Sequence, residues 1–432
     1  SFFIAVVNRA TNPQERFMSV PAYFWPLVYT VVMAGVTAYL TGGIGLHTLG
    51  GETGGGKKYL SVVLALVMFL ALTSYRIPVK YRSWYIAAFF LSASPALIGD
   101  ICALLPSPFT YVNLVIPLNE MIYAQSQGAE VSVRFAGLAM AAQVSIFLML
   151  AKWGLQGIYQ WRHPFRLVTF HIMLVATTLG GFRSMLAFLG LVLFCLFIME
   201  RLYRTAMLAW ILTAVIVVSA IVLPFAEHMP KSLQRSMAFL PVKIDPDVRM
   251  DADGSKEWRE RIWSAIWPQV PGYLLLGKGY ALRAEDFELM GSGSFAGVGV
   301  NVDATQEGLA ISMDYHNGPL STLMPFGIWG AISYIWLAAA GLFILYRNYR
   351  YGEPALLLVN RMLLVLMIGS VFSFLFIFGA YCDDLGKMAR LVGFSVALNW
   401  GVKAPPIKKY YQAAIRRLPN RHAPQPLHQP AA

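Results

Sequence analysis

Charged residues are scarce in this chain. Asp, Glu, Lys and Arg make up 13% of its 432 residues, whereas hydrophobic residues make up 57%. A soluble domain contains about one quarter charged residues, so this composition excludes an ordinary soluble protein. Apolar stretches recur along most of the chain, and several approach the roughly 20 residues that a helix needs to cross a bilayer. The composition therefore predicts an all-α polytopic membrane protein.

Cysteine is also rare, and no pattern of metal ligands is present. Cys102, Cys195 and Cys382 are isolated; a bond between Cys102 and Cys382 is left open, but packing residues are favoured. The acidic group from Asp245 to Asp253 lacks the glycine and ligand spacing of a calcium loop, and the histidines lack zinc spacing. No Gly-rich nucleotide-binding motif appears. We therefore expect a solvated acidic loop, no metal and no cofactor.

Ten apolar segments are predicted to span the membrane, within a range of ten to twelve. They comprise residues 20–41, 59–75, 83–105, 135–151, 167–181, 184–199, 206–226, 318–346, 362–380 and 388–402.

Basic residues indicate the orientation of these spans. Lys and Arg number 34 against 22 acidic residues, which in a soluble protein would suggest nucleic acid as a partner. Here they collect in alternate loops, so membrane topology explains them and no nucleic acid is expected. Both termini are then cytoplasmic, and the long loop lies on the external side of the membrane.

Four regions follow from this topology. They are N-terminal spans (1–226), a large external loop with amphipathic helices (227–316), C-terminal spans (317–402) and a basic cytoplasmic tail with a disordered end (403–432).

The segment 165–199 must cross the membrane twice. It is nearly continuous apolar sequence, broken only by GGFRS, and basic clusters flank it on both sides. A helical hairpin with Arg183 at its tip satisfies both flanks. Each arm has only about 15 residues, or about 23 Å, so the tip should lie below the outer surface. Arg183 then faces a cavity, or alternatively reaches the lipid headgroups.

The long loop carries two further arginines on a predicted amphipathic helix. Apolar residues recur at helical spacing across 258–267, and Arg259 and Arg261 lie between them. Two residues apart, the arginines point in different directions, so only one can share a partner with Arg183. The guanidinium group suits phosphate because its planar donors bind two oxygens at once. Contact with lipid phosphates is the alternative interpretation.

The loop closes on Tyr315-His316-Asn317, immediately before a span. Histidine transfers protons near neutral pH because of its ordinary pKa. His316 is therefore a candidate general base; the alternative is an interfacial histidine without chemistry.

Three pieces of sequence resemble the O-antigen ligase and polymerase family of bacterial membrane proteins. They are GGFRSMLAF, the stretch from Arg261 to LLGKGY, and YHNGPLSTLMPFGIWG, which together span about residues 180–330. The resemblance implies transfer of a polysaccharide from undecaprenyl pyrophosphate at the periplasmic face of a bacterial inner membrane, so the external loop 227–316 would be periplasmic. It matches His316 to the family histidine, Arg183 to the first arginine and Arg261 to the loop arginine, with Arg259 competing for the last position.

The resemblance favours the ligase branch, whose acceptor is the lipid A–core oligosaccharide. Polymerases, which act on lipid-linked repeat units, tend to carry two Arg-to-Gly loop motifs. This chain has one, at 261–277, and the loop 105–135 lacks a clear second. A transporter or flippase of lipid-linked glycans is a second alternative, but its charges should lie near mid-bilayer and its halves should repeat.

We accordingly expect a metal-independent, inverting glycosyltransferase embedded among membrane lipids. His316 takes the proton of the acceptor hydroxyl, and Arg183 and Arg261 hold the pyrophosphate. The further substrate-binding candidates are Arg259, Asn317, Tyr315 and Lys278.

Overall fold

The computed structural model describes residues 11, 18–45, 55–104, 134–281 and 313–405, and these residues form helices and turns without a strand. The α-helices are α2 (Pro21–Thr41), α3 (Gly56–Thr73), α4 (Arg82–Phe90), α5 (Ala96–Leu104), α7 (Ala136–Ile158), α8 (Pro164–Thr178), α9 (Arg183–Met199), α10 (Met207–Val222), α11 (Lys231–Ser236), α12 (Pro246–Ile266), α13 (Val270–Tyr273), α16 (Gly318–Tyr351), α17 (Leu357–Phe376) and α18 (Tyr381–Asn399).

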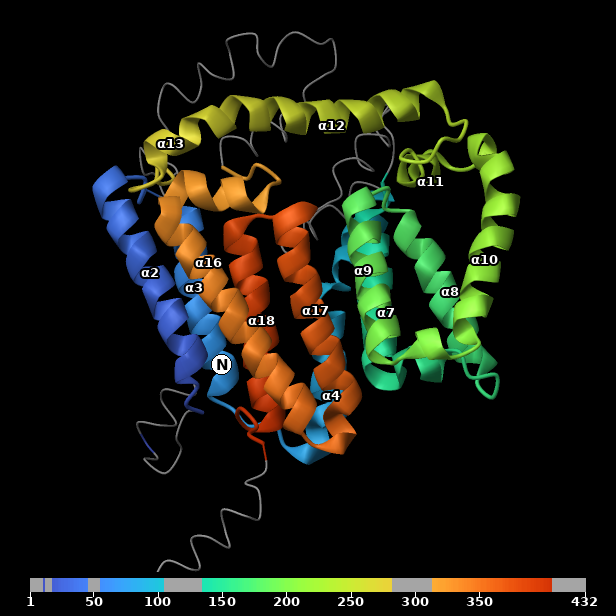
Figure 1. Ribbon diagram of the computed structural model, residues 1–432, viewed down its shortest axis with the longest axis horizontal. Helices are drawn as coiled ribbons and strands as arrows, with labels where there is room; N and C mark the ends of the chain where they lie inside the picture. The colour runs from blue at the N-terminus through green and yellow to red at the C-terminus, as the bar shows by residue number, and fades with distance from the viewer. Residues whose placement is uncertain (1–10, 12–17, 46–54, 105–133, 282–312, 406–432) are drawn as a thin grey trace, which may run out of the picture.

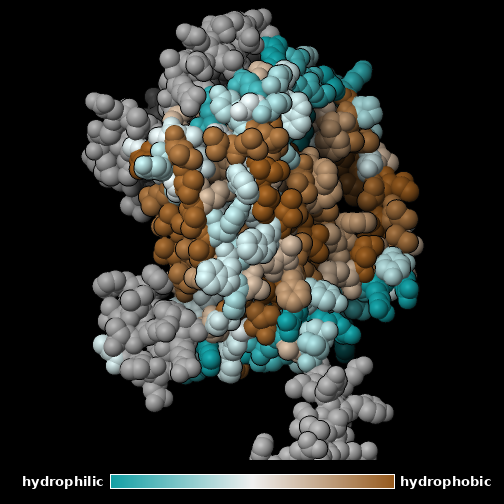
Figure 2. Space-filling view, turned by 60° about the vertical axis from the view of Figure 1, so that its left-hand side comes forward, coloured by the Kyte–Doolittle hydropathy of each residue, from teal (hydrophilic) through white to brown (hydrophobic). Residues whose placement is uncertain are grey.

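The apolar helices stand side by side, and α12 runs across one end of the bundle (Figure 1). We call this end the α12 end and the other the opposite end. Hydrophobic residues form a band between two hydrophilic ends (Figure 2), as expected where lipid surrounds the middle of the molecule. The core lies where α18 packs against α3, α16 and α17, whereas α10 stands at the edge and has no buried residue. The chain is a membrane protein.

Fewer helices than the ten predicted segments are both long enough and apolar enough to cross a membrane. Six helices of the described chain qualify, or seven if the pair Val79–Ala93 and Ala96–Leu104, bent by 46°, counts as one span. The arms α8 and α9, with 15 and 17 residues, are too short, and α18 carries four charged residues. The ten predicted segments are largely helical, but a count of ten to twelve spans is not confirmed.

Helix α16 is broken at Gly327. This residue has φ 60° and ψ −151°, a conformation that suits glycine because it lacks a Cβ. The first turns of α16 therefore lie under α12, and the remainder runs down through the bundle (Figure 1). The turn after α13 supplies hydrogen bonds to the carbonyl groups at the break. The backbone N–H groups of Lys278 and Gly279 donate to the carbonyl oxygens of Met324 and Pro325, at 2.7 and 3.0 Å. The LLGKGY piece thus completes a broken helix.

Replacing Gly327 with alanine is expected to destabilise the protein by more than about 2 kcal/mol. The new Cβ would lie 2.9 Å from the carbonyl carbon of Leu274, in a backbone conformation that alanine disfavours. Gly190→Ala is the matched control, because a Cβ at Gly190 meets nothing within 4 Å in α9. Thermal unfolding in detergent measures both. Equal melting temperatures for the two variants would contradict this account of the break.

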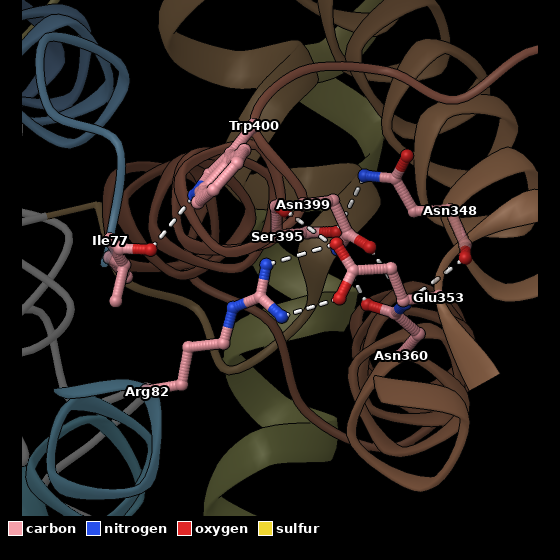
Figure 3. Close-up of polar contacts among 8 residues, drawn as sticks. All are labelled: Ile77, Arg82, Asn348, Glu353, Asn360, Ser395, Asn399 and Trp400. Carbon is pink, nitrogen blue, oxygen red and sulfur yellow. Dashed lines mark hydrogen bonds and ion pairs between the residues drawn. The ribbon is translucent and has the colours of Figure 1, made fainter. Parts of the chain in front are cut away.

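A polar network joins the helices at the opposite end (Figure 3). Asn360 and Asn399 exchange amide hydrogen bonds of 3.0 and 2.7 Å, and Asn348 donates to Ser395 at 3.0 Å. Beside them, the buried Arg82 pairs with Glu353. Reciprocal bonds satisfy these amides where water is excluded, so the network locks α16, α17 and α18 together. The rigid bundle holds the start of α16 in place under α12.

Candidate active site

Helix α12 starts at the acidic segment, which is helical and not the solvated loop that we expected. The Asp245 side chain accepts the backbone N–H of Asp247, and Pro246 follows at the first helical position. Aspartate and glycine within the segment are weak helix formers, and the Asp245 cap and Pro246 offset their low helix propensity. Buried Val248, Ala252 and other apolar residues then face the bundle. The helix is held down by this stripe over 21 residues.

Position along α12 separates Arg259 from Arg261. Arg259 follows Ala252 by seven residues, which places it about 20° from the buried stripe at 100° per residue. Arg261 lies about 180° from Ala252 and pairs with Glu257 at 3.4 Å, a partly exposed contact. Burial and the charge of Arg183 lower the pKa of Arg259. Arg259 therefore lies on the bundle side of α12, near enough to Arg183 for their charges to interact, and Arg261 lies on the other side. The catalytic role predicted for Arg261 stays a prediction.

Arg183 stands at the predicted hairpin tip, where four residues separate α8 from α9. Its guanidinium donates to the backbone oxygen of Ala252 on α12, at 2.8 Å. Arg183 is also the first residue of α9, so the unpaired N–H groups and the positive end of the helix dipole lie beside its charge. The hairpin thus presents cationic groups to the underside of α12.

Two arginines that sequence reasoning did not select enlarge this cluster. Arg134 and Arg235 flank the turn at Gly181, and both pair with Asp251, Arg134 at 3.3 Å. Arg235 is 4% exposed; burial, followed by the charges of Arg134, Arg183 and Arg259, lowers its pKa to about 9. It is still protonated at neutral pH.

The cluster, defined as Arg134, Arg183, Arg235 and Arg259, therefore carries an excess of positive charge. Asp251 is the acid that the described residues place in contact with it. Mutual repulsion among these partly buried guanidinium groups is unfavourable, and an anion with several oxygens relieves it. The arrangement can hold a phosphate or pyrophosphate group.

His316 lies against the same side of α12. Its ring packs 5.8 Å from that of Trp258 and 4.4 Å from that of Phe378, between centroids. Burial, followed by the charge of Arg259, lowers the pKa of His316 to about 4, so the imidazole is neutral at pH 7. Its Nδ1 is buried and has no hydrogen-bond partner among the described residues. A neutral ring with an unpaired nitrogen beside a cationic cluster can accept a proton from a bound hydroxyl.

The neighbours of His316 hold its unusual backbone. His316 has φ 51°, a left-handed conformation that costs a residue other than glycine about 1–2 kcal/mol. The carbonyl of the buried Tyr315 accepts from Trp263 at 2.8 Å, and the Asn317 side chain caps α16 by accepting from Leu320 at 3.1 Å. Asp314 accepts the backbone N–H of His316, and burial raises the pKa of that acid. Tyr315 and Asn317 thus flank His316 and hold the backbone around it; the substrate contacts predicted for them stay predictions.

Lys278 belongs to the turn that repairs α16. It is 5% exposed, and its ammonium nitrogen lies 5.8 Å from the ring centre of Tyr273. Its backbone is committed to Met324. A substrate contact of Lys278 stays a prediction. Among the described residues, no group of three His, Cys, Asp or Glu side chains is arranged to hold a metal.

The pH dependence of turnover should report the low pKa of His316. A base acts when deprotonated, so kcat/KM is expected to fall only as the pH drops through about 4 and to stay level from about 5.5 to 8. The corresponding limb of kcat should lie at higher pH, because a bound anion offsets the charge of Arg259. Initial rates over this range measure both limbs. A midpoint of kcat/KM near 6.5 would show an unperturbed histidine and contradict the burial argument.

Part of the chain matches a known protein family. Residues 167–335 match the family model described as O-Antigen ligase, from α8 through the break in α16. No curated protein matches the chain, and no solved structure does. Arg183, Arg259 and His316 all lie inside the matched segment, whereas Arg134 precedes it. The matched family supports ligase- or polymerase-type activity on lipid-linked glycans in a membrane. Over residues 167–335 the chain is therefore similar to the O-antigen ligase family.

Proposed function

We propose that the protein transfers a polysaccharide from undecaprenyl pyrophosphate to the lipid A–core oligosaccharide. The observation that carries the proposal is the neutral, half-buried His316, whose buried Nδ1 has no hydrogen-bond partner among the described residues, beside a cluster of four arginines. The first group suits an acceptor hydroxyl, and the second suits the pyrophosphate of the donor.

The proposed reaction is a direct displacement at the anomeric carbon of the donor. The acceptor oxygen forms a bond to that carbon while the bond from the carbon to the pyrophosphate oxygen breaks. His316 takes the proton of the hydroxyl, and the electron pair leaves on the lipid pyrophosphate. Arg183 and Arg259 stabilise the charge that develops on the leaving group. Attack opposite the leaving group inverts the anomeric configuration.

The proposed topology places the α12 end in the periplasm. Ten crossings result if the bent α4–α5 pair, the short arms α8 and α9, and α18 are added to the six long spans. Both termini are then cytoplasmic in an inner membrane, as the basic loops predict. The regions 1–226, 227–316, 317–402 and 403–432 keep the roles given above.

The chemical identity of the acceptor distinguishes the proposed ligase activity from a polymerase activity. The absence of a second Arg-to-Gly motif in the sequence favours the ligase. Purified protein in liposomes, with lipid-linked donor and either lipid A–core or a lipid-linked repeat unit as acceptor, tests this directly. Product on lipid A–core alone is expected; product on the repeat unit alone would make the protein a polymerase. Movement of donor across the bilayer without a new glycosidic bond would make it a transporter.

Turnover is expected to survive removal of divalent cations. The arginine cluster supplies permanent positive charge where other enzymes that cleave pyrophosphate use a metal. The assay is the liposome reaction with excess EDTA, compared with an untreated sample, and the rates should agree within about twofold. Loss of turnover that only a divalent ion restores would contradict the metal-free mechanism.

A further inference from the structure

A cavity of about 330 Å³ lies at the opposite end of the bundle, far along α9 from Arg183. It is bounded by the ends of α7 and α9 and the start of α17. Its polar walls are formed by Gln156, Gln160, Glu200, Arg201 and Arg361, with Trp153 beside them. The volume lies at the small end of the range of ligand pockets, about 300–1,000 Å³.

Helix α7 is broken beside this cavity, and the backbone at the break binds Glu200, the acidic residue in the cavity wall. Gly154 has φ 64° and ψ 175°, which interrupts the hydrogen bonds of α7. The Glu200 carboxylate accepts the freed backbone N–H groups of Leu155 and Gln156, at 3.0 and 2.9 Å. It also pairs with Arg361 at 2.6 Å. Glu200 therefore has its partners inside the protein, and its charge is offset there.

The other charges at the cavity are positive. Arg201 is exposed at its wall, and Arg361 has a buried Nε without a hydrogen-bond partner among the described residues. Arg166 lies at its edge, 4.7 Å over the ring of Trp153, and donates to the Gly157 carbonyl. Three guanidinium groups against one carboxylate leave an excess of two positive charges. Such an excess, with amide donors beside it, suits an anion.

We propose that this cavity binds a phosphate group, in the first place that of an anionic phospholipid headgroup. Guanidinium groups bind phosphate oxygens in pairs, and basic pockets between the ends of membrane helices are sites for lipid phosphates. Trp153 lies in the wall of the cavity, and tryptophan is enriched at the headgroup level of a bilayer. The site is separate from the arginine cluster under α12 and does not rest on the proposed function.

Arg201→Gln is the test variant. Glutamine keeps the left-handed backbone of Arg201 at a similar cost, and it removes the charge and three of the five N–H donors. Arg361 is left intact, because its loss would leave Glu200 buried and unpaired. Arg350→Gln is the matched control, since Arg350 is exposed at the same end and does not line the cavity.

The experiment uses the full chain in a neutral detergent. The thermal midpoint is followed against short-chain phosphatidylglycerol, phosphatidylcholine and inorganic phosphate, which gives an apparent affinity for each. Phosphatidylglycerol is expected to bind at least about tenfold more tightly than phosphatidylcholine. Arg201→Gln should lower the apparent affinity for phosphatidylglycerol about fivefold, and Arg350→Gln should lower it less than about twofold.

The outcomes divide clearly. Saturable binding of inorganic phosphate that competes with phosphatidylglycerol would support the site and assign it to a soluble phosphate compound. Phosphatidylglycerol binding without such competition would support it as a lipid site. Equal losses in the two variants, or no saturable binding of either phosphate source, would overturn the proposal.

Discussion

Replacing His316 with asparagine is expected to slow glycan transfer by about 10²- to 10⁴-fold, the usual contribution of a positioned general base. The amide of asparagine is not protonated at neutral pH and cannot take the hydroxyl proton. Asparagine also tolerates the left-handed backbone that His316 adopts at φ 51°, so the loop should keep its course. Loss of rate then reports the imidazole and not the backbone. The liposome reaction, with donor and lipid A–core, measures the rate.

The control for this variant is His171→Asn. His171 is exposed on α8, and its ring bonds to the carbonyl of its own helix at Leu167. Its replacement should leave the rate unchanged. Size-exclusion elution and the melting temperature of both variants should match the unmodified protein. A His316→Asn variant that retains more than about one tenth of the rate would remove His316 as the base.

Replacing Arg183 or Arg259 with glutamine is expected to lower kcat by about 10²- to 10³-fold, as removal of one group that stabilises an anionic leaving group does. Arg183 contacts the underside of α12, Arg259 projects from α12, and their charges act on each other. Arg261→Gln is the matched control from the same helix, because Arg261 points away and pairs with Glu257. Its effect should stay below about threefold, within the range of an exposed ion pair.

Stability distinguishes a functional arginine from a structural one in this cluster. Burial and repulsion from Arg183 already disfavour the charge of Arg259. Arg259→Gln should therefore keep or raise the melting temperature while activity falls, as often occurs where a site holds unfavourable charges. A lower melting temperature with unchanged kcat would show that Arg259 is structural. A large loss of kcat in Arg261→Gln, without one in Arg259→Gln, would reverse the assignment.

Much of the helical arrangement could be predicted from the sequence because lipid imposes simple rules. Segments without water must satisfy their backbone internally, so long apolar runs become helices. The hairpin at Arg183 also followed, since basic clusters flank the segment on both sides. The helical start of the acidic segment was missed, although Asp245 followed by Pro246 is a recognisable helix start. The acidic composition of the segment indicates a solvated loop, whereas the order of Asp245 and Pro246 indicates a helix start.

The partners of the arginines could not be predicted in the same way. Arg134 and Arg235 are distant in sequence from Arg183, and only the packing of α11 and α12 over the hairpin brings them together. The buried stripe of α12 through Ala252 and Ile266 would have favoured Arg259, had the helix been extended to its true start. The loop motif from Arg261 to LLGKGY favoured Arg261 as the site residue. In the structure, the end of this motif forms backbone hydrogen bonds to α16 beside its break.

The sequence alone determined that this is an α-helical membrane protein, that Arg183 lies at a hairpin tip, and that His316 precedes a span. These follow from apolar length, flanking charge and order along the chain, which are local properties. Only the tertiary structure decided which arginine of α12 faces Arg183 and that the imidazole of His316 is neutral. Both depend on burial and on charges contributed by distant segments, because the electrostatic field at a site is the sum over everything packed around it.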